Sequence, residues 1–184
     1  FKESNKAEIE QPGANGLGNA STQLMNAMSD LSSNPADPAT RRGVLARAVD
    51  LAARFSEAGG ALDQAQANAT ADLRVMVSEV NALARNIAQT NQKIAEVVGR
   101  GQPANDLLDE RDRLISQLSD KVQVTRMDAS DGTTSVFMAG GQRLVLGSTA
   151  AELSVVQDPI DAHRSAVALK EGSLTRILSE TEMG

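Results

Sequence analysis

The stretch that decides the fold runs from Pro38 to Val98 and reads PATRRGVLARAVDLAARFSEAGGALDQAQANATADLRVMVSEVNALARNIAQTNQKIAEVV. Apolar side chains recur in it at alternating spacings of four and three residues, which is the period of one face of an α-helix. We call the following set the packing stripe: Val44, Leu51, Phe55, Leu62, Leu73, Met76, Val80, Leu83, Ile87, Ile94 and Val97. The stripe predicts one long helix, which at 1.5 Å per residue would extend roughly 90 Å.

Two features interrupt this period. Gly59-Gly60 costs about 1 kcal/mol per glycine relative to alanine in a helix interior, but the stripe enters and leaves the pair in phase. One extra residue between Ala69 and Leu73 makes a local 11-residue step, which relaxes a left-handed supercoil. We therefore predict a helix that continues through both features.

The segment before the long helix is predicted to be less regular. Residues 1–18 are polar and rich in glycine, and we expect them to be extended or loosely ordered. A short helix is expected at residues 19–31. A helix corner follows, made of Asn34, Pro35, Asp37 and Pro38. Pro35 cannot continue the first helix, whereas Asp37 can cap the second with Pro38 at its first position.

The segment Gly99-Arg100-Gly101-Gln102-Pro103 is expected to end the long helix, because glycine and proline are typical of helix C-termini. Asn105 or Asp106 is then expected to cap a second helix that runs to about Asp120. Its apolar side chains are Leu107, Leu108, Leu114, Ile115 and Leu118. We expect this helix to lie antiparallel to the long one.

From Lys121 onward the apolar period changes to two, which is typical of strands. Asp131-Gly132 and Gly140-Gly141 are turn signals between these strands. The apolar positions are Val122, Val124, Val136, Met138, Leu144 and Leu146. We predict a small antiparallel meander here, followed by weaker strands at 152–157 and 165–170 and a last short helix at Leu174–Glu180.

The predicted fold class is α+β: an elongated antiparallel helical rod, with one very long helix and shorter helices, joined to a small antiparallel β meander domain. The domains expected are a loose segment at 1–18, the helical rod at 19–120, the β-rich domain at 121–171 and the start of a truncated helical segment at 172–184. Because the first residues carry neither an initiator Met nor a signal pattern, we expect a fragment of a longer protein.

The composition of the 184-residue chain argues against several functional classes. Aromatic residues make up 2% of it, with no Trp or Tyr, so base-stacking and sugar-binding sites are disfavoured. A net charge of -6 disfavours nucleic acid as a partner. The chain holds no Cys and no apolar run as long as a membrane span, so we expect neither thiolate chemistry nor membrane insertion.

Candidate chemical sites each have a simpler explanation. His163 is the single imidazole, and its polar surroundings favour an exposed loop residue. Asp109, Glu110 and Asp112 could form a carboxylate cluster, but Asp109 and Arg113 have the spacing of a helical salt pair. We therefore assign no catalytic residue and predict that the chain is not an enzyme.

Two glycine-containing segments are only superficially similar to binding loops. Residues 128–132 resemble a calcium loop, yet no bidentate Glu follows and Asp131-Gly132 is a typical hairpin turn. Gly16-Leu17-Gly18 lacks the preceding strand and third glycine of a phosphate-binding loop. The sequence therefore predicts no metal and no cofactor.

Three separate motifs resemble the flagellar hook-associated protein 1 family. They are the corner at 31–39 with Arg42, the pair Ile87-Ala88 with Asn91 and Ile94, and a family motif at the start of the second rod helix. The family motif comprises Asn105, Asp106, Leu107, Leu108, Asp109, Glu110, Arg111 and Asp112. The resemblance covers about residues 16–148, with the motifs in the order and spacing of the family.

The resemblance implies an extracellular structural subunit of the bacterial flagellum, exported by the flagellar type III route, that joins hook to filament by packing in a helical array. It implies as partners the hook protein, the filament-side junction protein (hook-associated protein 3), copies of itself and an export chaperone. The alternative is a flagellin-like filament subunit or another secreted coiled-coil surface protein. The short helices cover roughly half of the stripe, so we expect part of it to be incompletely buried within one subunit.

Overall fold

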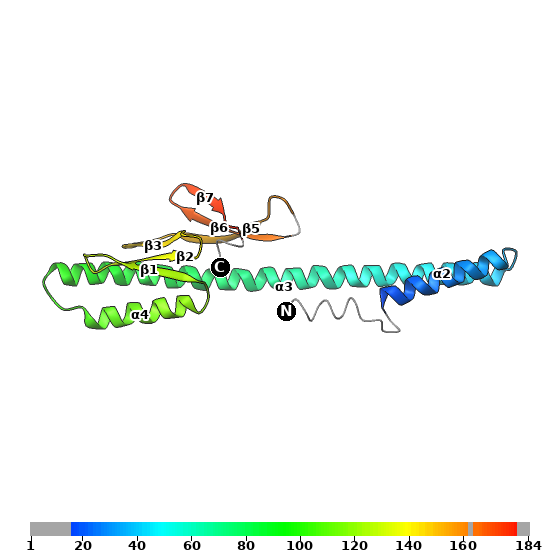
Figure 1. Cartoon of the computed structure of the whole chain (residues 1–184), viewed down its shortest axis with the longest axis horizontal. Coiled ribbons are helices and arrows are strands. Elements are labelled where there is room, and N and C mark those ends of the chain that lie inside the picture. The colour runs from blue at the N-terminus through cyan, green and yellow to red at the C-terminus, as the bar shows by residue number, and fades with distance from the viewer. Residues whose placement is uncertain (1–15, 162–163, 180–184) are drawn as a thin grey trace. The chain divides into compact units, whose positions relative to one another are not determined.

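A computed structural model describes residues 16–161 and 164–179. The loose segment expected at the N-terminus, apart from its last residues, and His163 lie outside the described residues. The chain divides into two compact units, Phe1–Ala67 and Asn68–Gly184. Within these described residues there are three helices and two small antiparallel sheets, which confirms the α+β class (Figure 1).

The first unit contains helix α2 (Leu17–Ser33) and the first part of helix α3 (Pro38–Gly99), joined by the predicted corner. The N–H of Asn34 donates to the carbonyl of Asp30 at 3.0 Å and ends α2. The Oδ1 atom of Asp37 accepts the N–H of Ala39 at 3.0 Å, so Asp37 caps α3 as predicted. The guanidinium of Arg41 donates to the carbonyl of Pro35 at 2.7 and 3.0 Å, which ties the corner to the first turn of α3.

Helix α3 is uninterrupted through Gly59-Gly60, which confirms the prediction of a single long helix. Its C-terminus is closed by Gly101, which has a φ of +73°. The N–H of Gly101 donates to the carbonyl of Val98 at 2.8 Å, and the N–H of Gln102 donates to that of Val97 at 3.1 Å. These two bonds form a Schellman motif, which requires a left-handed residue and explains the glycine.

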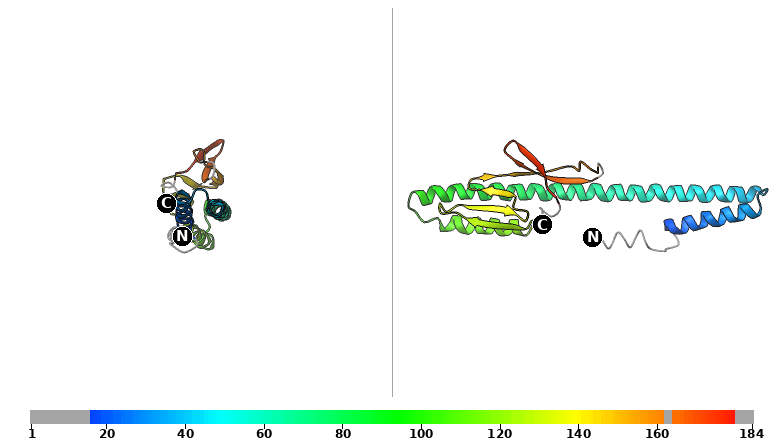
Figure 2. Two further views of the ribbon diagram at one scale, coloured as in Figure 1. Left: turned by 90° about the vertical axis from the view of Figure 1, so that its right-hand side faces the viewer. Right: turned by 45° about the horizontal axis from the view of Figure 1, so that its top comes forward.

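Helix α4 (Asn105–Ser119) lies antiparallel to the end of α3, as predicted (Figures 1 and 2). The predicted cap is wrong, because the N-cap residue is Ala104 and no side chain in the described part of the chain caps the helix. Ala104 is 7% exposed. Burial of its methyl group thus sets the start of the helix and leaves Asn105 and Asp106 exposed in the first turn.

The first sheet confirms the predicted meander and its turns. It contains β1 (Val124–Asp128), β2 (Thr134–Met138), β3 (Arg143–Leu146) and β4 (Thr149–Ala150), all antiparallel in that order. The pairing of β2 with β3 shifts between Val136 and Phe137. This irregularity buries Leu144 together with Val145 and leaves Leu146 44% exposed, so the expected two-residue period fails in β3.

The second sheet contains the two strands expected from the sequence and one that was not. Its order is β5 (Glu152–Gln157), β6 (Ser165–Glu171) and β7 (Leu174–Ile177). The short helix predicted at residues 174–180 is wrong, because β7 occupies its first turn. Leu174 pairs with Glu171 across the two residues Gly172-Ser173, and Gly172 has a φ of +60°. A glycine with positive φ at the first position of a two-residue loop makes a type II′ hairpin, not a helix start.

One core in the second unit joins the end of α3 to α4 and both sheets (Figure 2). Branched side chains from every layer are almost fully buried in it. They include Val80 and Ile87 from α3, Leu118 from α4, Val136 and Leu144 from the first sheet, and Leu153 and Val167 from the second. This part of α3 therefore serves as the support on which the sheets pack.

Candidate functional site

The packing stripe has a different environment at its two ends. All buried residues of α3 lie between Val77 and Ile94. Within the stripe Val80, Ile87 and Ile94 are buried, and Val44, Leu51, Leu73, Leu83 and Val97 are half-buried. Phe55, Leu62 and Met76 are exposed, at 58%, 64% and 45%. Sequence period thus identified the helix, whereas burial divides its stripe into a covered and an uncovered part.

The first unit exposes several large apolar side chains. We define its exposed apolar set as Met25, Met28, Leu45, Val49, Phe55 and Leu62. These side chains come from α2 and from the first part of α3. Apolar surface that a folded unit leaves uncovered is typical of an interaction surface. The set is therefore the candidate assembly surface of this unit.

Asn91 holds the first sheet on α3. Its buried side-chain amide donates to the carbonyl of Thr134 at 2.7 Å and to that of Gly147 at 2.8 Å. Its Oδ1 atom accepts the N–H of Thr134 at 3.1 Å. The amide thus pairs with β2 as a neighbouring strand would, at a residue where β3 does not reach. A buried amide is tolerated only when it is hydrogen-bonded, so these contacts fix the position of the sheet.

Asn81 holds the second sheet on α3. Its side chain donates to the carbonyl of Leu153 at 2.7 Å and accepts the N–H of Leu153 at 2.8 Å. Asn81 belongs to none of the sequence motifs described above, although its position carries a signal. Asn81 falls between Val77 and Ala84 on the buried face of α3, so it is a polar residue at a position where the helical period predicts an apolar one.

Arg111, from the family motif, ties the helices to the hairpin between β1 and β2. It is buried, and its Nη1 atom donates to the carbonyl of Gly132 at 2.7 Å. The Nε atom of Arg111 has no hydrogen-bond partner within the described part of the chain. Gly132 has a φ of +83°, a conformation that favours glycine, and a Cβ there would make a tight contact of 3.2 Å with the Ile94 side chain.

The other residues of the family motif lie mainly on the surface. Leu107 and Leu108 are half-buried, and Asp109 is exposed. Arg113 forms its ion pair with Glu110 at 2.7 and 3.0 Å, so the pair predicted with Asp109 is wrong. Spacing i,i+3 lets the planar guanidinium meet both oxygens of one carboxylate. This contact lowers the pKa of Glu110 below its ordinary value of 4.5, first through the hydrogen bond from Arg113.

The remaining carboxylates serve ordinary structural roles. Asp112 accepts from Arg126 at 3.1 Å. Asp131 accepts the hydroxyl of Thr133 at 2.7 Å and its N–H at 2.9 Å, and these bonds lower the pKa of Asp131. Across residues 16–161 and 164–179 there is no group of three or more His, Asp or Glu side chains suited to a metal ion. Nor is any helix among these residues long and apolar enough to cross a membrane.

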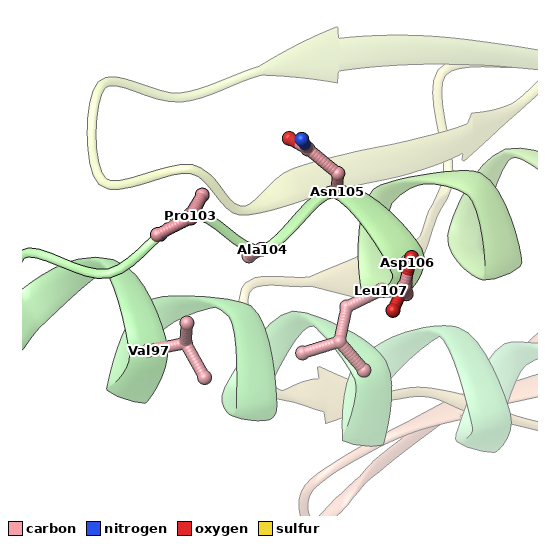
Figure 3. Close-up of a pocket in the computed structure, with 6 residues that line it drawn as sticks. All are labelled: Val97, Pro103, Ala104, Asn105, Asp106 and Leu107. Carbon is pink, nitrogen blue, oxygen red and sulfur yellow. The ribbon is translucent and has the colours of Figure 1, made fainter.

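A small pocket lies where α3 ends and α4 begins (Figure 3). Its volume is about 300 Å³, and it is lined by Val97, Pro103, Ala104, Asn105, Asp106 and Leu107. Figure 3 shows Val97 and Leu107 facing the space between the two helices, while the amide of Asn105 points away from it. The pocket therefore has an apolar floor beside the first turn of α4.

Comparison with known proteins gives a consistent result. The family model for the flagellar hook-associated protein FlgK helical domain matches residues 7–184. Flagellar hook-associated protein 1 of Escherichia coli K12 is 32% identical over 156 residues, which is 84% of this chain and 28% of the relative. Flagellar hook-associated protein 1 of Bacillus subtilis 168 is 27% identical over 171 residues, or 92% of this chain and 34% of the relative.

A solved structure agrees in fold. The flagellar hook junction protein FlgK from Burkholderia pseudomallei superimposes with a TM-score of 0.84 at 28% sequence identity. The match covers 98% of this chain and 33% of that one. The chain thus spans about a third of the length of the relatives that it matches.

Proposed function

Because the chain belongs to the flagellar hook-associated protein FlgK family, we propose that it is a structural subunit of the bacterial flagellum that joins the hook to the filament. The observation that carries the proposal is the match over residues 7–184, with a solved hook junction protein of the same fold. The motifs at the corner, at Asn91 and in the family motif agree with it. These comparisons favour the hook-associated protein over the flagellin-like alternative.

The structure supports a mechanism based on packing. In the second unit the buried amides of Asn81 and Asn91 fix two sheets on α3, which gives a firm body for contact with neighbours. In the first unit the exposed apolar set offers surface for burial against another segment. Many modest contacts repeated around an array can then hold the junction together without one tight site.

The partners proposed on this basis are the hook protein, the filament-side junction protein (hook-associated protein 3), further copies of this chain and an export chaperone. The proposed location is extracellular, within the flagellum, after export through the flagellar type III route. The work of such a subunit is mechanical, so no catalytic residue, cofactor or metal takes part in it.

Complementation tests the proposal. The intact protein that contains this chain is expressed in a strain of its source that lacks the gene, and filaments attached to hooks are counted by electron microscopy. We expect attachment to return. A matched variant with Leu45→Asp and Phe55→Asp, both at exposed positions, is expected to be exported and folded but to restore fewer filaments. Hooks that remain bare while the unaltered protein is exported and folded would contradict the proposed function.

A further inference from the structure

Gly59 and Gly60 lie side by side in the interior of α3, and neither the conformation nor the packing among the described residues requires glycine there. Both residues belong to the helix, and neither has a positive φ. A Cβ added to either one would meet no other side chain and no other element within 4 Å. Glycine nevertheless makes a helix less stable than alanine does, because its backbone loses more freedom on folding. The pair therefore weakens α3 at this point.

The glycine pair stands in a part of α3 that the described residues leave uncovered. Every residue from 55 to 65 is exposed, which is about three helical turns. We call residues 55–65 the bare stretch. Arg54, immediately before it, and Gln66, immediately after it, are half-buried. The bare stretch therefore lies between two parts of the helix that have at least partial cover.

A helix without tertiary cover depends on its own hydrogen bonds. Helices shorter than about 12–15 residues are marginal in water even when they are rich in alanine, and most helix stability in proteins comes from packing of one face. The bare stretch is shorter than this and contains two glycines. The part of α3 between Val77 and Ile94, by contrast, carries all of its buried residues. Local opening of the bare stretch should therefore require much less free energy than opening of the covered part.

We propose that Gly59-Gly60 is a joint at which α3 opens locally and bends while the core of the second unit stays closed. Pairs of glycine or serine are among the few identified causes of sharp bends in helices. Opening at the joint breaks backbone hydrogen bonds of the bare stretch but separates no buried side chain. The joint is a property of this chain alone, so it does not depend on the proposed function.

Native-state hydrogen exchange on the purified chain tests the joint. We expect lower protection factors in the bare stretch than at residues 80–94. The double variant Gly59→Ala with Gly60→Ala should raise protection in the bare stretch by about thirtyfold, the factor that corresponds to replacing two glycines with alanine in a helix interior. Gly43→Ala is the matched control, because Gly43 is also an exposed glycine of α3 with nothing within 4 Å of an added Cβ. It should leave protection in the bare stretch unchanged.

Two results of this experiment would overturn the proposal. The first is protection in the bare stretch as high as in the covered part of α3. The second is equal protection of the bare stretch in the double variant and the unaltered chain. Bare hooks in the complementation experiment, alongside exchange that depends on the glycine pair, would instead refute only the proposed function.

Cleavage by a glutamyl endopeptidase gives a second measurement within the same helix. Glu57 lies in the bare stretch, whereas Glu79 lies in the covered part, and both are exposed. Because proteolysis follows the population of the locally opened form when opening is fast, we expect cleavage after Glu57 to be much faster than cleavage after Glu79. The double variant should slow cleavage after Glu57 by about the same factor as its exchange. Equal cleavage rates at the two glutamates would contradict a joint at Gly59-Gly60.

Discussion

The two ends of α3 share one helical period but differ in what surrounds them. Between Val77 and Ile94 the helix is covered by α4 and two sheets, and it carries the buried amides of Asn81 and Asn91. In the first unit the same period continues through Phe55 and Leu62, which stay exposed. The comparison shows that a periodic stripe specifies a helix without specifying what covers it. In the second unit the position of the sheets on α3 is fixed by the polar residues Asn81 and Asn91, which lie among apolar residues on the buried face of the helix.

The buried amides also differ from apolar contacts in specificity. Apolar side chains can pack against any similar surface, whereas an amide that bonds both the N–H and the carbonyl of one residue selects a single register. Asn91 selects Thr134, and Asn81 selects Leu153.

The largest expected effect separates the two ends of α3 directly. Ile87→Ala removes a fully buried side chain and should lower the free energy of unfolding by about 3 kcal/mol. Leu62→Ala, at an exposed position, should change it by less than about 0.5 kcal/mol. Urea unfolding followed by circular dichroism measures both. Equal effects would mean that the stripe is covered alike at both ends.

Asn91→Ala tests whether the amide is essential to the covered end. It leaves the N–H and carbonyl of Thr134 and the carbonyl of Gly147 without their partner, so we expect a loss of about 2 kcal/mol or more. Gln92→Ala, at the neighbouring exposed position, is the matched control and should be close to neutral. An Asn91→Ala protein as stable as the control would show that apolar packing alone holds the sheet.

A smaller effect is expected at the start of α3. Asp37→Ala removes the acceptor of the Ala39 N–H and should cost about 1 kcal/mol of helix stability. Hydrogen exchange at Ala39 should become faster, and thermal unfolding of the first unit should begin at a lower temperature. Asp63→Ala, within the exposed part of α3, is the control. Unaltered hydrogen exchange at Ala39 would contradict the assignment of Asp37 as the cap of α3.

The smallest expected effect is on the dependence of folding stability on pH. The hydroxyl and N–H of Thr133 lower the pKa of Asp131 below its ordinary value of 3.8, so the charged carboxylate is favoured in the folded state. Its contribution to stability is therefore present above about pH 4 and is lost as the pH falls through the lowered pKa. Asp131→Asn should make stability slightly less dependent on pH between about 5 and about 2, the range in which aspartate carboxyls titrate. Asp109→Asn is the control, and an identical profile for both variants would contradict the assignment.

The sequence was sufficient to predict the secondary structure wherever the pattern was local and extended over many residues. The helix through Gly59-Gly60, the corner at Asp37 and the meander turns follow from period and capping, and all are confirmed. The prediction of a helix at β7 was wrong because four residues are too few to distinguish a period of 3.6 from a period of two. The predicted N-cap of α4 was wrong because burial of Ala104 outweighs the capping preference of Asn105. The division into domains and the roles of the site residues stay predictions.

Long-range contacts were beyond the reach of such patterns. The motifs that carry the resemblance include Asn91 but not its partner, Thr134, which lies 43 residues along the chain. Nothing between Asn81 and Leu153 indicates that they meet. Buried polar residues at apolar phases are nevertheless a usable signal, because each needs a partner outside its own helix.

The separation of these pairs along the chain sets the order of events in folding. Asn81 is 72 residues from Leu153, so the second sheet docks only after a long loop has closed. Helix formation involves local contacts and relaxes within about a microsecond, whereas non-local contacts slow folding. A subunit folding from an extended chain would therefore form α3 before its sheets cover it. During that interval neither sheet covers the stripe.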